Sequence, residues 1–203
     1  MEELWSVEGF LAGDAVVHSC RRSAGVEISV AAELRAGRVG CFDVSWHTAR
    51  ELLLSANYQI DKHGVHVVRQ RAGLATELRQ IPIDQKPQTP LLFPLMRVFT
   101  GPLISRLLTQ GGSGEVVVPC IDDPAAVDEL LWPRTSERRA TMLQRNTTQL
   151  VSGRDVPCIL CEYEGDQYGP GTRLWVDGEQ RLLRYHWRQN ADQFWDVGLA
   201  EGD

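Results

Sequence analysis

The sequence predicts a mainly β protein, a curved antiparallel sheet or half-open β barrel, with a short helical insert as a lid. Apolar and polar residues alternate with a period of two over many short segments, which is typical of strands with one buried face. Short turn sequences connect these segments, so neighbouring strands are expected to pair antiparallel. One stretch, residues 91–110, is strongly apolar and too long for a strand.

The first half of the chain is expected to form a meander. Alternation is clearest in residues 38–46, which place Trp46 on the apolar face, and in residues 54–60, which place Tyr58 there. Residues 61–64 (Asp-Lys-His-Gly) predict a hairpin turn, because glycine adopts a positive φ easily. The predicted strands cover residues 15–22, 26–34, 38–46, 54–60, 65–70 and 74–81.

The middle of the chain differs from the meander. Residues 84–90 are polar and contain two prolines, which predicts a loop that leaves the sheet. The apolar residues that follow predict a helical insert over about 90–110, in two short pieces separated by Gly101 and Pro102. Two further glycines end the second piece. We expect this insert to cover one face of the sheet.

The last part of the chain returns to strands. Asp123 followed by Pro124 is typical of a helix start, so a short helix is expected over about 124–131. Residues 177–179 predict a tight turn. No linker rich in Pro, Gly or Ser divides the chain, and we expect residues 1–203 to form a single domain. The predicted strands cover residues 115–121, 139–150, 157–164, 172–176, 180–189 and 193–199.

Composition and charge exclude several classes of protein. Hydrophobic residues make up 43% and charged residues 24% of the chain, which suits a globular protein and not a disordered one. The formal net charge of −6 and the lack of a basic patch disfavour nucleic-acid binding. No stretch reaches the ~20 apolar residues of a transmembrane helix. The N-terminal residues do not resemble a secretory leader and the five cysteines are scattered, so we expect a cytoplasmic protein.

No motif identifies a catalytic or metal site. Cys158 and Cys161 have the spacing of a metal or redox pair, but the flanking alternation predicts a strand, which points the two thiols to opposite faces. The five histidines show no metal-ligand spacing. Asp122 and Asp123 are candidates for acid–base chemistry, although Asp123 before Pro124 is better explained as a helix cap. We therefore expect no cofactor and no metal, and we identify no catalytic residue.

Aromatic residues gather in the C-terminal strands, where Tyr185 and Trp187 share one strand face. A sheet face rich in Trp and Tyr can bind a flat or apolar ligand, and the alternative is that these rings fill the core beneath the insert. The nearby Arg173, Arg184 and Arg188 either hold an anionic ligand or form a solvated face. The predicted ligand-binding residues are Trp46, Tyr58, Arg97, Phe99, Tyr163, Trp175, Tyr185 and Trp187.

Two segments carry a resemblance to a group of bacterial proteins. One is residues 94–102 (Pro-Leu-Met-Arg-Val-Phe-Thr-Gly-Pro), which lead through a glycine turn to residues 116–119 (Val-Val-Val-Pro). The other is the expected hairpin around residues 174–177 and 182–185. With the meander, they resemble the DUF3108-like half-barrel domains, which are distantly similar to the lipoprotein-carrier fold. That resemblance implies a curved antiparallel sheet with short helices over its concave, apolar side.

These observations lead to a ranked set of functional hypotheses. The first is a binding module that holds a small apolar, lipid-like or aromatic molecule between the sheet and the insert. The second is a cofactor-independent enzyme that positions a small apolar biosynthetic intermediate, with Tyr58, Arg97, Glu162 and Tyr163 as polar participants. The third is a protein-interaction domain that uses a strand edge or an apolar patch. The sequence predicts neither the oligomeric state nor the identity of the ligand.

Overall fold

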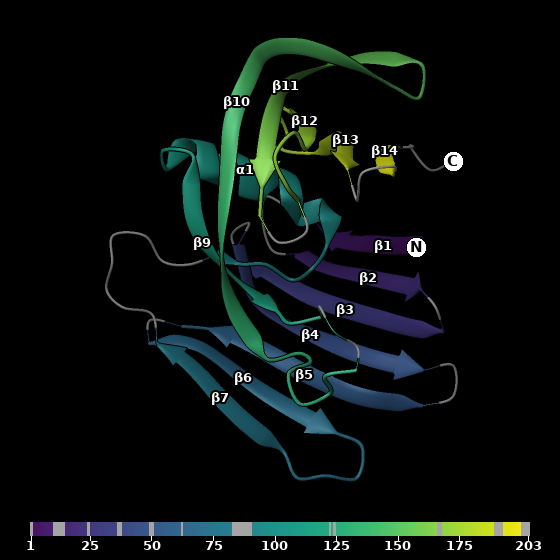
Figure 1. Ribbon diagram of the computed structural model, residues 1–203, viewed down its shortest axis with the longest axis vertical. Coiled ribbons are helices and arrows are strands. Elements are labelled where there is room, and N and C mark those ends of the chain that lie inside the picture. Colours follow the sequence, from purple (N-terminus) through teal and green to yellow (C-terminus); the bar gives the residue numbers. More distant parts are fainter. Residues whose placement is uncertain are drawn as a thin grey trace. The chain divides into compact units, whose positions relative to one another are not determined.

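Strands account for most of the computed structural model, which confirms the predicted mainly β fold class (Figure 1). They form two open seven-stranded sheets, with strand orders β1-β2-β3-β4-β5-β6-β7 and β14-β13-β12-β11-β10-β9-β8. The structure describes residues 2–9, 15–23, 25–35, 38–48, 51–61, 63–82, 91–121, 123, 125–165, 168–188 and 193–199.

The first sheet is the predicted antiparallel meander, in which each strand pairs with its neighbour in the chain. The N-terminal strand β1, which pairs with β2, was not predicted. The expected turn at residues 61–64 is present, and the Asp61 carboxylate accepts hydrogen bonds from the backbone N–H groups of His63 and Gly64. The strands are β1 (Glu2–Gly9), β2 (Ala15–Ser23), β3 (Val26–Arg35), β4 (Arg38–Thr48), β5 (Leu52–Ile60), β6 (Gly64–Arg71) and β7 (Glu77–Pro82).

One face of this meander is buried, as alternation requires. Phe42 pairs with Tyr58, and their rings stack with centroids 4.4 Å apart. Trp46 pairs with Leu54 on the same face, so the predicted faces of β4 and β5 are correct. The buried face includes Val17, Val30, Ala32, Leu34, Phe42, Val44, Trp46, Leu54, Ala56, Tyr58, Val65 and Val67.

The second sheet contains a long hairpin and a C-terminal meander. Its antiparallel pairs run β10–β11–β12–β13–β14, and β10 carries two register shifts between Met142 and Thr147. Strand β10 is longer than the strand predicted for this region. The elements are β8 (Leu91–Leu92), β9 (Ser113–Pro119), β10 (Pro133–Val151), β11 (Arg154–Glu164), β12 (Arg173–Asp177), β13 (Leu182–Arg188) and β14 (Phe194–Gly198).

The helical insert expected over about 90–110 is helical only from Arg97, since Leu91–Leu92 form strand β8, and the expected split at Gly101 and Pro102 is wrong as well. A 3-10 turn η1 (Arg97–Phe99) leads directly into helix α1 (Thr100–Thr109). Pro102 lies in the first turn of α1, where its missing N–H breaks no helical hydrogen bond. Gly101 lets the helix approach a neighbouring turn, since a Cβ atom there would lie 1.9 Å from the carbonyl oxygen of Gln180. Gly111 and Gly112, both with positive φ, end the segment as expected.

The described residues between 125 and 131 form turns, so the short helix expected over about 124–131 is wrong. The Asp123 carboxylate accepts a hydrogen bond from the N–H of Ala125, as a capping aspartate would. A helix does not follow, because Leu131 has a positive φ of 57° and donates its N–H to the carbonyl of Cys120. Asp122 and Pro124 lie outside the described residues.

The chain divides into two compact units, which we treat separately. The first unit is Met1–Met96 with Val117–Thr135, and the second is Arg97–Val116 with Ser136–Asp203. Strands β9 and β10 contain residues of both units. That the whole chain is a single domain therefore stays a prediction.

Candidate functional site

The strand register of the second unit gathers three of the seven predicted aromatic residues on one sheet face. Cys161 pairs with Leu174, Leu174 with Tyr185, and Trp187 with Trp195. The guanidinium carbon of Arg97 lies 5.0 Å from the ring centroid of Tyr185, so η1 and the start of α1 lie on this same side, beside strands β11–β13 (Figure 1). We call this surface the tyrosine face and define it by Cys161, Tyr163, Leu174, Tyr185 and Trp187.

The loop between β11 and β12 adds a further ring to the tyrosine face. Gly165 and Tyr168 form a β-bridge with two backbone hydrogen bonds of 2.9 and 3.0 Å. The Tyr168 ring lies 5.6 Å from that of Tyr163 and 5.5 Å from that of Trp187, with an edge-on geometry towards Trp187. Tyr163 is buried, whereas Tyr168 and Trp187 are only partly buried. The bridge therefore holds Tyr168 between a buried ring and a half-exposed one.

A buried arginine lies beneath this cluster. Arg138, which is 2% exposed, comes from β10 and hydrogen-bonds the hydroxyl of Tyr163. A Cβ atom on Gly165 would lie 2.4 Å from Cδ of Arg138, so only glycine fits against this side chain. Burial raises the pKa of the Tyr163 phenol to about 12, although the Arg138 guanidinium acts in the opposite direction. The phenol therefore stays protonated at neutral pH.

Trp175 lies on the opposite face of the same sheet. It pairs with Arg184, whose guanidinium carbon lies 5.2 Å from its ring centroid. Arg184 also donates to both carboxylate oxygens of Asp196, at 2.7 and 2.5 Å. Beside these contacts, Trp175 packs against a small core cluster formed by Val151, Cys158 and Leu183. The sheet thus separates Trp175 from Tyr185 and Trp187, with which it was grouped in the predicted set.

The remaining predicted residues divide between the units. Arg97 and Phe99 belong to η1 of the second unit, where Phe99 is buried. Trp46 and Tyr58 belong to the buried face of the first unit. Ligand binding by the complete predicted set stays a prediction, and the structure brings together Arg97, Tyr163, Tyr185 and Trp187 of the set.

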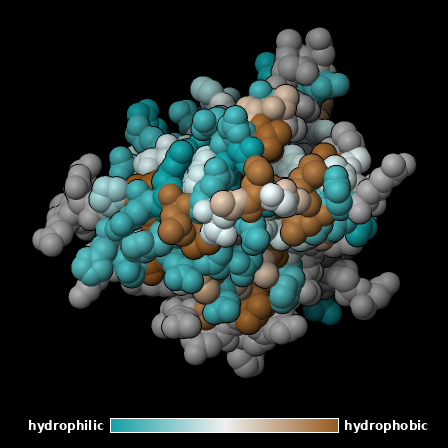
Figure 2. All heavy atoms as spheres, turned by 90° about the horizontal axis from the view of Figure 1, so that it is seen from below, coloured by the Kyte–Doolittle hydropathy of each residue, from teal (hydrophilic) through white to brown (hydrophobic). Residues whose placement is uncertain are grey.

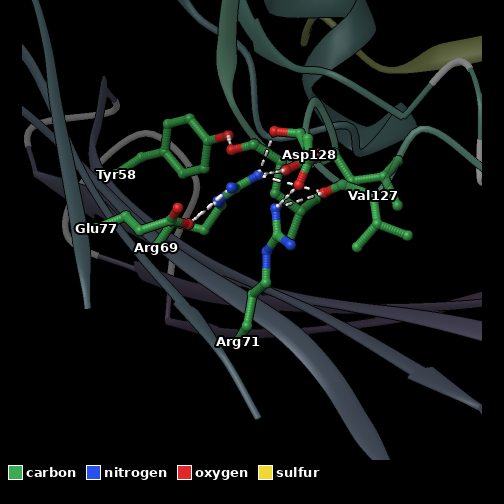
Figure 3. A network of polar contacts seen from close by, with 8 residues as sticks. Tyr58, Arg69, Arg71, Glu77, Val127 and Asp128 are labelled. Atoms are coloured by element: carbon green, nitrogen blue, oxygen red, sulfur yellow. Dashed lines mark hydrogen bonds and ion pairs between the residues drawn. The ribbon is translucent and has the colours of Figure 1, made fainter. Parts of the chain in front are cut away.

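Tyr58 belongs to a polar network in the first unit (Figure 3). Its hydroxyl donates a 2.5 Å hydrogen bond to the backbone carbonyl of Leu131. Burial, followed by the nearby Cys120 thiol, raises the pKa of this phenol above its usual range. Tyr58 is therefore a permanent hydrogen-bond donor at neutral pH, and its donor is already used to hold the chain at residue 131.

Arg69 is the centre of this network, and the sequence analysis missed it. The side chain is 1% exposed, and its Nε and Nη2 atoms lie 2.8 and 2.7 Å from Oε2 of Glu77. Its Nη1 donates to the carbonyls of Asp128 and Leu130, at 2.9 and 2.8 Å (Figure 3). The guanidinium carbon also lies 4.2 Å from the ring centroid of Trp132. Arg69 thus binds the turns over residues 127–132 to the sheet.

A signal for this anchor was present in the alternation of β6. Val65 and Val67 lie on the buried face, and Arg69 is the next residue of the same parity. A charged residue in register with an apolar face predicts a buried, paired charge. Neighbouring side chains reinforce the contact, since Arg71 forms a 2.5 Å ion pair with Asp128 and Arg79 also lies 4.2 Å from the Trp132 ring centroid. The Nε, Nη1 and Nη2 atoms of Arg69 all contact the chain's own carboxylate and carbonyl groups, which is typical of a structural anchor.

The remaining candidate residues for redox and acid–base chemistry also lie on opposite faces of the second sheet. Cys158 packs with Trp175, whereas Cys161 lies on the tyrosine face, so the two thiols point to opposite faces as expected. Burial raises the pKa of the Cys161 thiol to about 11. Glu162 and Tyr163 are consecutive in β11 and also point to opposite faces. These two proposed participants in catalysis therefore do not form an acid–base pair.

No cluster of three or more His, Cys, Asp or Glu side chains is arranged to hold a metal ion in the described part of the chain. Within the same residues, no helix has the length and apolar character needed to cross a bilayer.

Comparison with known proteins supports the fold only. No family model matches the chain, and no curated protein matches it. Among solved structures, the chain is similar to the crystal structure of a β-barrel-like protein from Brucella abortus, a domain of unknown function termed DUF1849. The TM-score is 0.51 at 9% sequence identity, and the alignment covers 93% of this chain and 81% of that chain. The likeness shows a β-barrel-like fold and carries no information on activity.

Proposed function

We propose that the second unit binds a small aromatic or apolar molecule on its tyrosine face, against Tyr168 and Trp187. The observation that carries the proposal is the edge-on pair of half-exposed rings, 5.5 Å apart, that continues the buried cluster of Tyr163 and Tyr185. Aromatic rings that are partly exposed offer apolar contact area and polar tips together, as ligand sites commonly do.

The first unit supports this function less well. Trp46 and Tyr58 are buried, and Tyr58 is engaged both by Phe42 and by the carbonyl of Leu131. A ligand that used these side chains would have to replace contacts that hold the meander to the turns at residues 127–132. We therefore restrict the proposed site to Arg97, Tyr163, Tyr168, Tyr185 and Trp187.

The resemblance of the sequence to the DUF3108-like domains agrees with this proposal. A β-barrel-like neighbour is compatible with the half-barrel architecture of the DUF3108-like and lipoprotein-carrier groups, in which short helices cover an apolar sheet face. The segment η1–α1, which lies beside the tyrosine face, has the corresponding place in this chain. We extend the proposal to a cytoplasmic binding module with no cofactor.

The proposal can be tested by titration with N-phenyl-1-naphthylamine, an uncharged probe that fluoresces in apolar surroundings. We expect saturable binding at one site. Trp187→Leu should weaken it about tenfold, since an aromatic contact contributes roughly 1–1.5 kcal/mol. Phe194→Leu is the matched control, because Phe194 is 67% exposed and pairs with Arg188 on the opposite face. Non-saturable binding, or equal effects of the two variants, would contradict the proposal.

One observation favours the alternative of a protein-interaction domain. Strand β14 lies at the edge of the second sheet and exposes Phe194 and Trp195, the latter 45% exposed. An exposed edge strand with aromatic side chains is a template for pairing with another chain. By contrast, the view of Figure 2 shows hydrophobic surface broken into separate patches by hydrophilic side chains. A protein that does not bind the naphthylamine probe would make interaction through β14 the better-supported function.

A further inference from the structure

We infer that two copies of this chain associate through β7, an edge strand of the first sheet, which pairs antiparallel with itself about a two-fold axis at Leu78. The inference goes beyond the proposed function, because it concerns the first unit only and needs no ligand. Among the described strands, β7 (Glu77–Pro82) pairs only with β6, so one of its edges has no neighbouring strand (Figure 1). Such an edge is a template for a further strand.

The backbone of β7 shows which residues face this open edge. The N–H and C=O groups of consecutive strand residues point to opposite edges. The Ile81 carbonyl points towards β6, since a Cβ atom on Gly64 of β6 would collide with its oxygen. Pro82, the next residue, therefore faces the open edge, as is usual for a proline, which has no N–H to donate. Leu78 and Gln80 have the parity of Pro82, so their N–H and C=O groups are directed to a facing strand.

The inner face of β7 carries two opposite charges. Glu77 and Arg79 are two residues apart and point to the same side of the sheet. Glu77 binds Arg69 through Oε2, and its Oε1 atom has no partner among the described residues. The Arg79 guanidinium carbon lies 4.2 Å from the Trp132 ring centroid, and the group forms no hydrogen bond or ion pair with the described part of the chain. A facing strand can therefore pair with both charges.

These two charges are complementary to their own two-fold image. An axis at Leu78 places Glu77 opposite the partner's Arg79, and Arg79 opposite the partner's Glu77. Opposite charges that face each other across a strand pair stabilise it, and like charges destabilise it. Moving the axis by one residue in either direction would bring two glutamates or two arginines face to face. The charges thus favour one register, and in a symmetric dimer the favourable pair occurs twice.

The outer face gains apolar contacts in the same register. Leu78 is 76% exposed and pairs with Val68 of β6, which is 39% exposed. At the axis, Leu78 lies directly opposite the partner's Leu78, so the leucine and valine side chains of both chains form one continuous row. Removing this apolar surface from water favours association.

The strand is protected against other partners. Short length, charged side chains and proline all discourage an edge strand from pairing with an arbitrary chain, and β7 has all three features. Its charges exclude strands of a different pattern while they fit a second copy of β7, which makes the contact selective. A pair of short strands buries little surface, so we expect a weak dimer that dissociates on dilution.

Sedimentation equilibrium of the full-length chain at a series of concentrations tests this inference, and we expect a reversible monomer–dimer equilibrium. Leu78→Lys should abolish the dimer, because it places two ammonium groups at the axis. Leu150→Lys is the matched control, since Leu150 is 71% exposed but lies on β10, which is not an edge strand. It should leave the dissociation constant unchanged. Circular dichroism checks that each variant is folded.

Substitution of Arg79 tests the register. Arg79→Glu replaces both opposite-charge pairs by like-charge pairs and should weaken dimerisation at least about tenfold. Arg79→Lys keeps the charge and should change the dissociation constant less than about threefold. A chain that stays monomeric up to about 1 mM would overturn the inference. A dimer that survives Leu78→Lys, equal effects of the two leucine variants, or equal effects of the two Arg79 variants would do the same.

Discussion

Arg69 in the first unit and Arg138 in the second are both almost completely buried, yet they have different neighbours. Arg69 is held by Glu77 and by backbone carbonyls of the turns at residues 127–132. Arg138 hydrogen-bonds Tyr163, at the base of a ring cluster that ends in half-exposed Tyr168 and Trp187. Burial by itself therefore does not distinguish a structural anchor from a candidate site.

The tyrosines of the two units show the same contrast. Tyr58 is buried, stacked on Phe42, and donates its hydroxyl proton to the chain. Tyr168 is partly exposed, and its ring lies edge-on to that of Trp187, with the two ring planes 67° apart. A side chain whose hydroxyl and ring are already in contact with the rest of the chain can make few contacts with a ligand. A partly exposed ring still has surface that a ligand can cover. Three substitution pairs test this contrast.

The largest effect is expected at Arg69. Arg69→Met removes the cation and leaves the carbonyls of Asp128 and Leu130 without their donor, so the free energy of unfolding should fall by about 3–5 kcal/mol. Chemical denaturation followed by circular dichroism measures this change. Arg79→Gln is the control, because Arg79 contacts the same Trp132 ring but is exposed, and it should cost less than about 1 kcal/mol. Similar losses for both variants would mean that Arg69 is not the anchor.

An intermediate effect is expected where the helix meets the β12–β13 turn. Gly101→Ala would place a Cβ atom 1.9 Å from the Gln180 carbonyl oxygen, so α1 must shift. We expect a loss of about 1–3 kcal/mol in thermal or chemical unfolding, despite the better helix propensity of alanine. Gly178→Ala, in the same turn but with no atom within 4 Å, should have little effect. An unchanged Gly101 variant would show that the close approach of helix and turn is not required.

The smallest effect on stability is expected when the hydroxyl group of Tyr58 or Tyr168 is removed. Tyr58→Phe removes the hydrogen bond to the Leu131 carbonyl and should lower the free energy of unfolding by about 1–2 kcal/mol. Tyr168→Phe makes the same chemical change on a partly exposed ring and should cost less than about 0.5 kcal/mol. If Tyr168→Phe is the more destabilising of the two, Tyr168 is a structural residue and the proposed site loses its main support.

Within each strand, the alternation of the sequence correctly predicted which residues of the candidate site share a face. Alternation placed Tyr185 and Trp187 on one face and put Cys158 and Cys161 on opposite faces, as observed. It did not place Trp175 relative to Tyr185, because that depends on the register between β12 and β13. Tyr168 was missed for a related reason, since it reaches the cluster through a loop bridge that has no periodic pattern.

The sequence by itself determined the mainly β class, the antiparallel meander and the turn at residues 61–64, because these follow from local alternation and turn chemistry. Only the tertiary structure decided that residues 125–131 form turns and not a helix, and that α1 is continuous through Gly101. In both cases a group outside the segment is responsible: the N–H of Leu131, which a helix would donate to the carbonyl of Val127, is donated to the carbonyl of Cys120, and the carbonyl of Gln180 lies where a side chain at position 101 would be. Such contacts join residues far apart in the chain, so no local pattern records them.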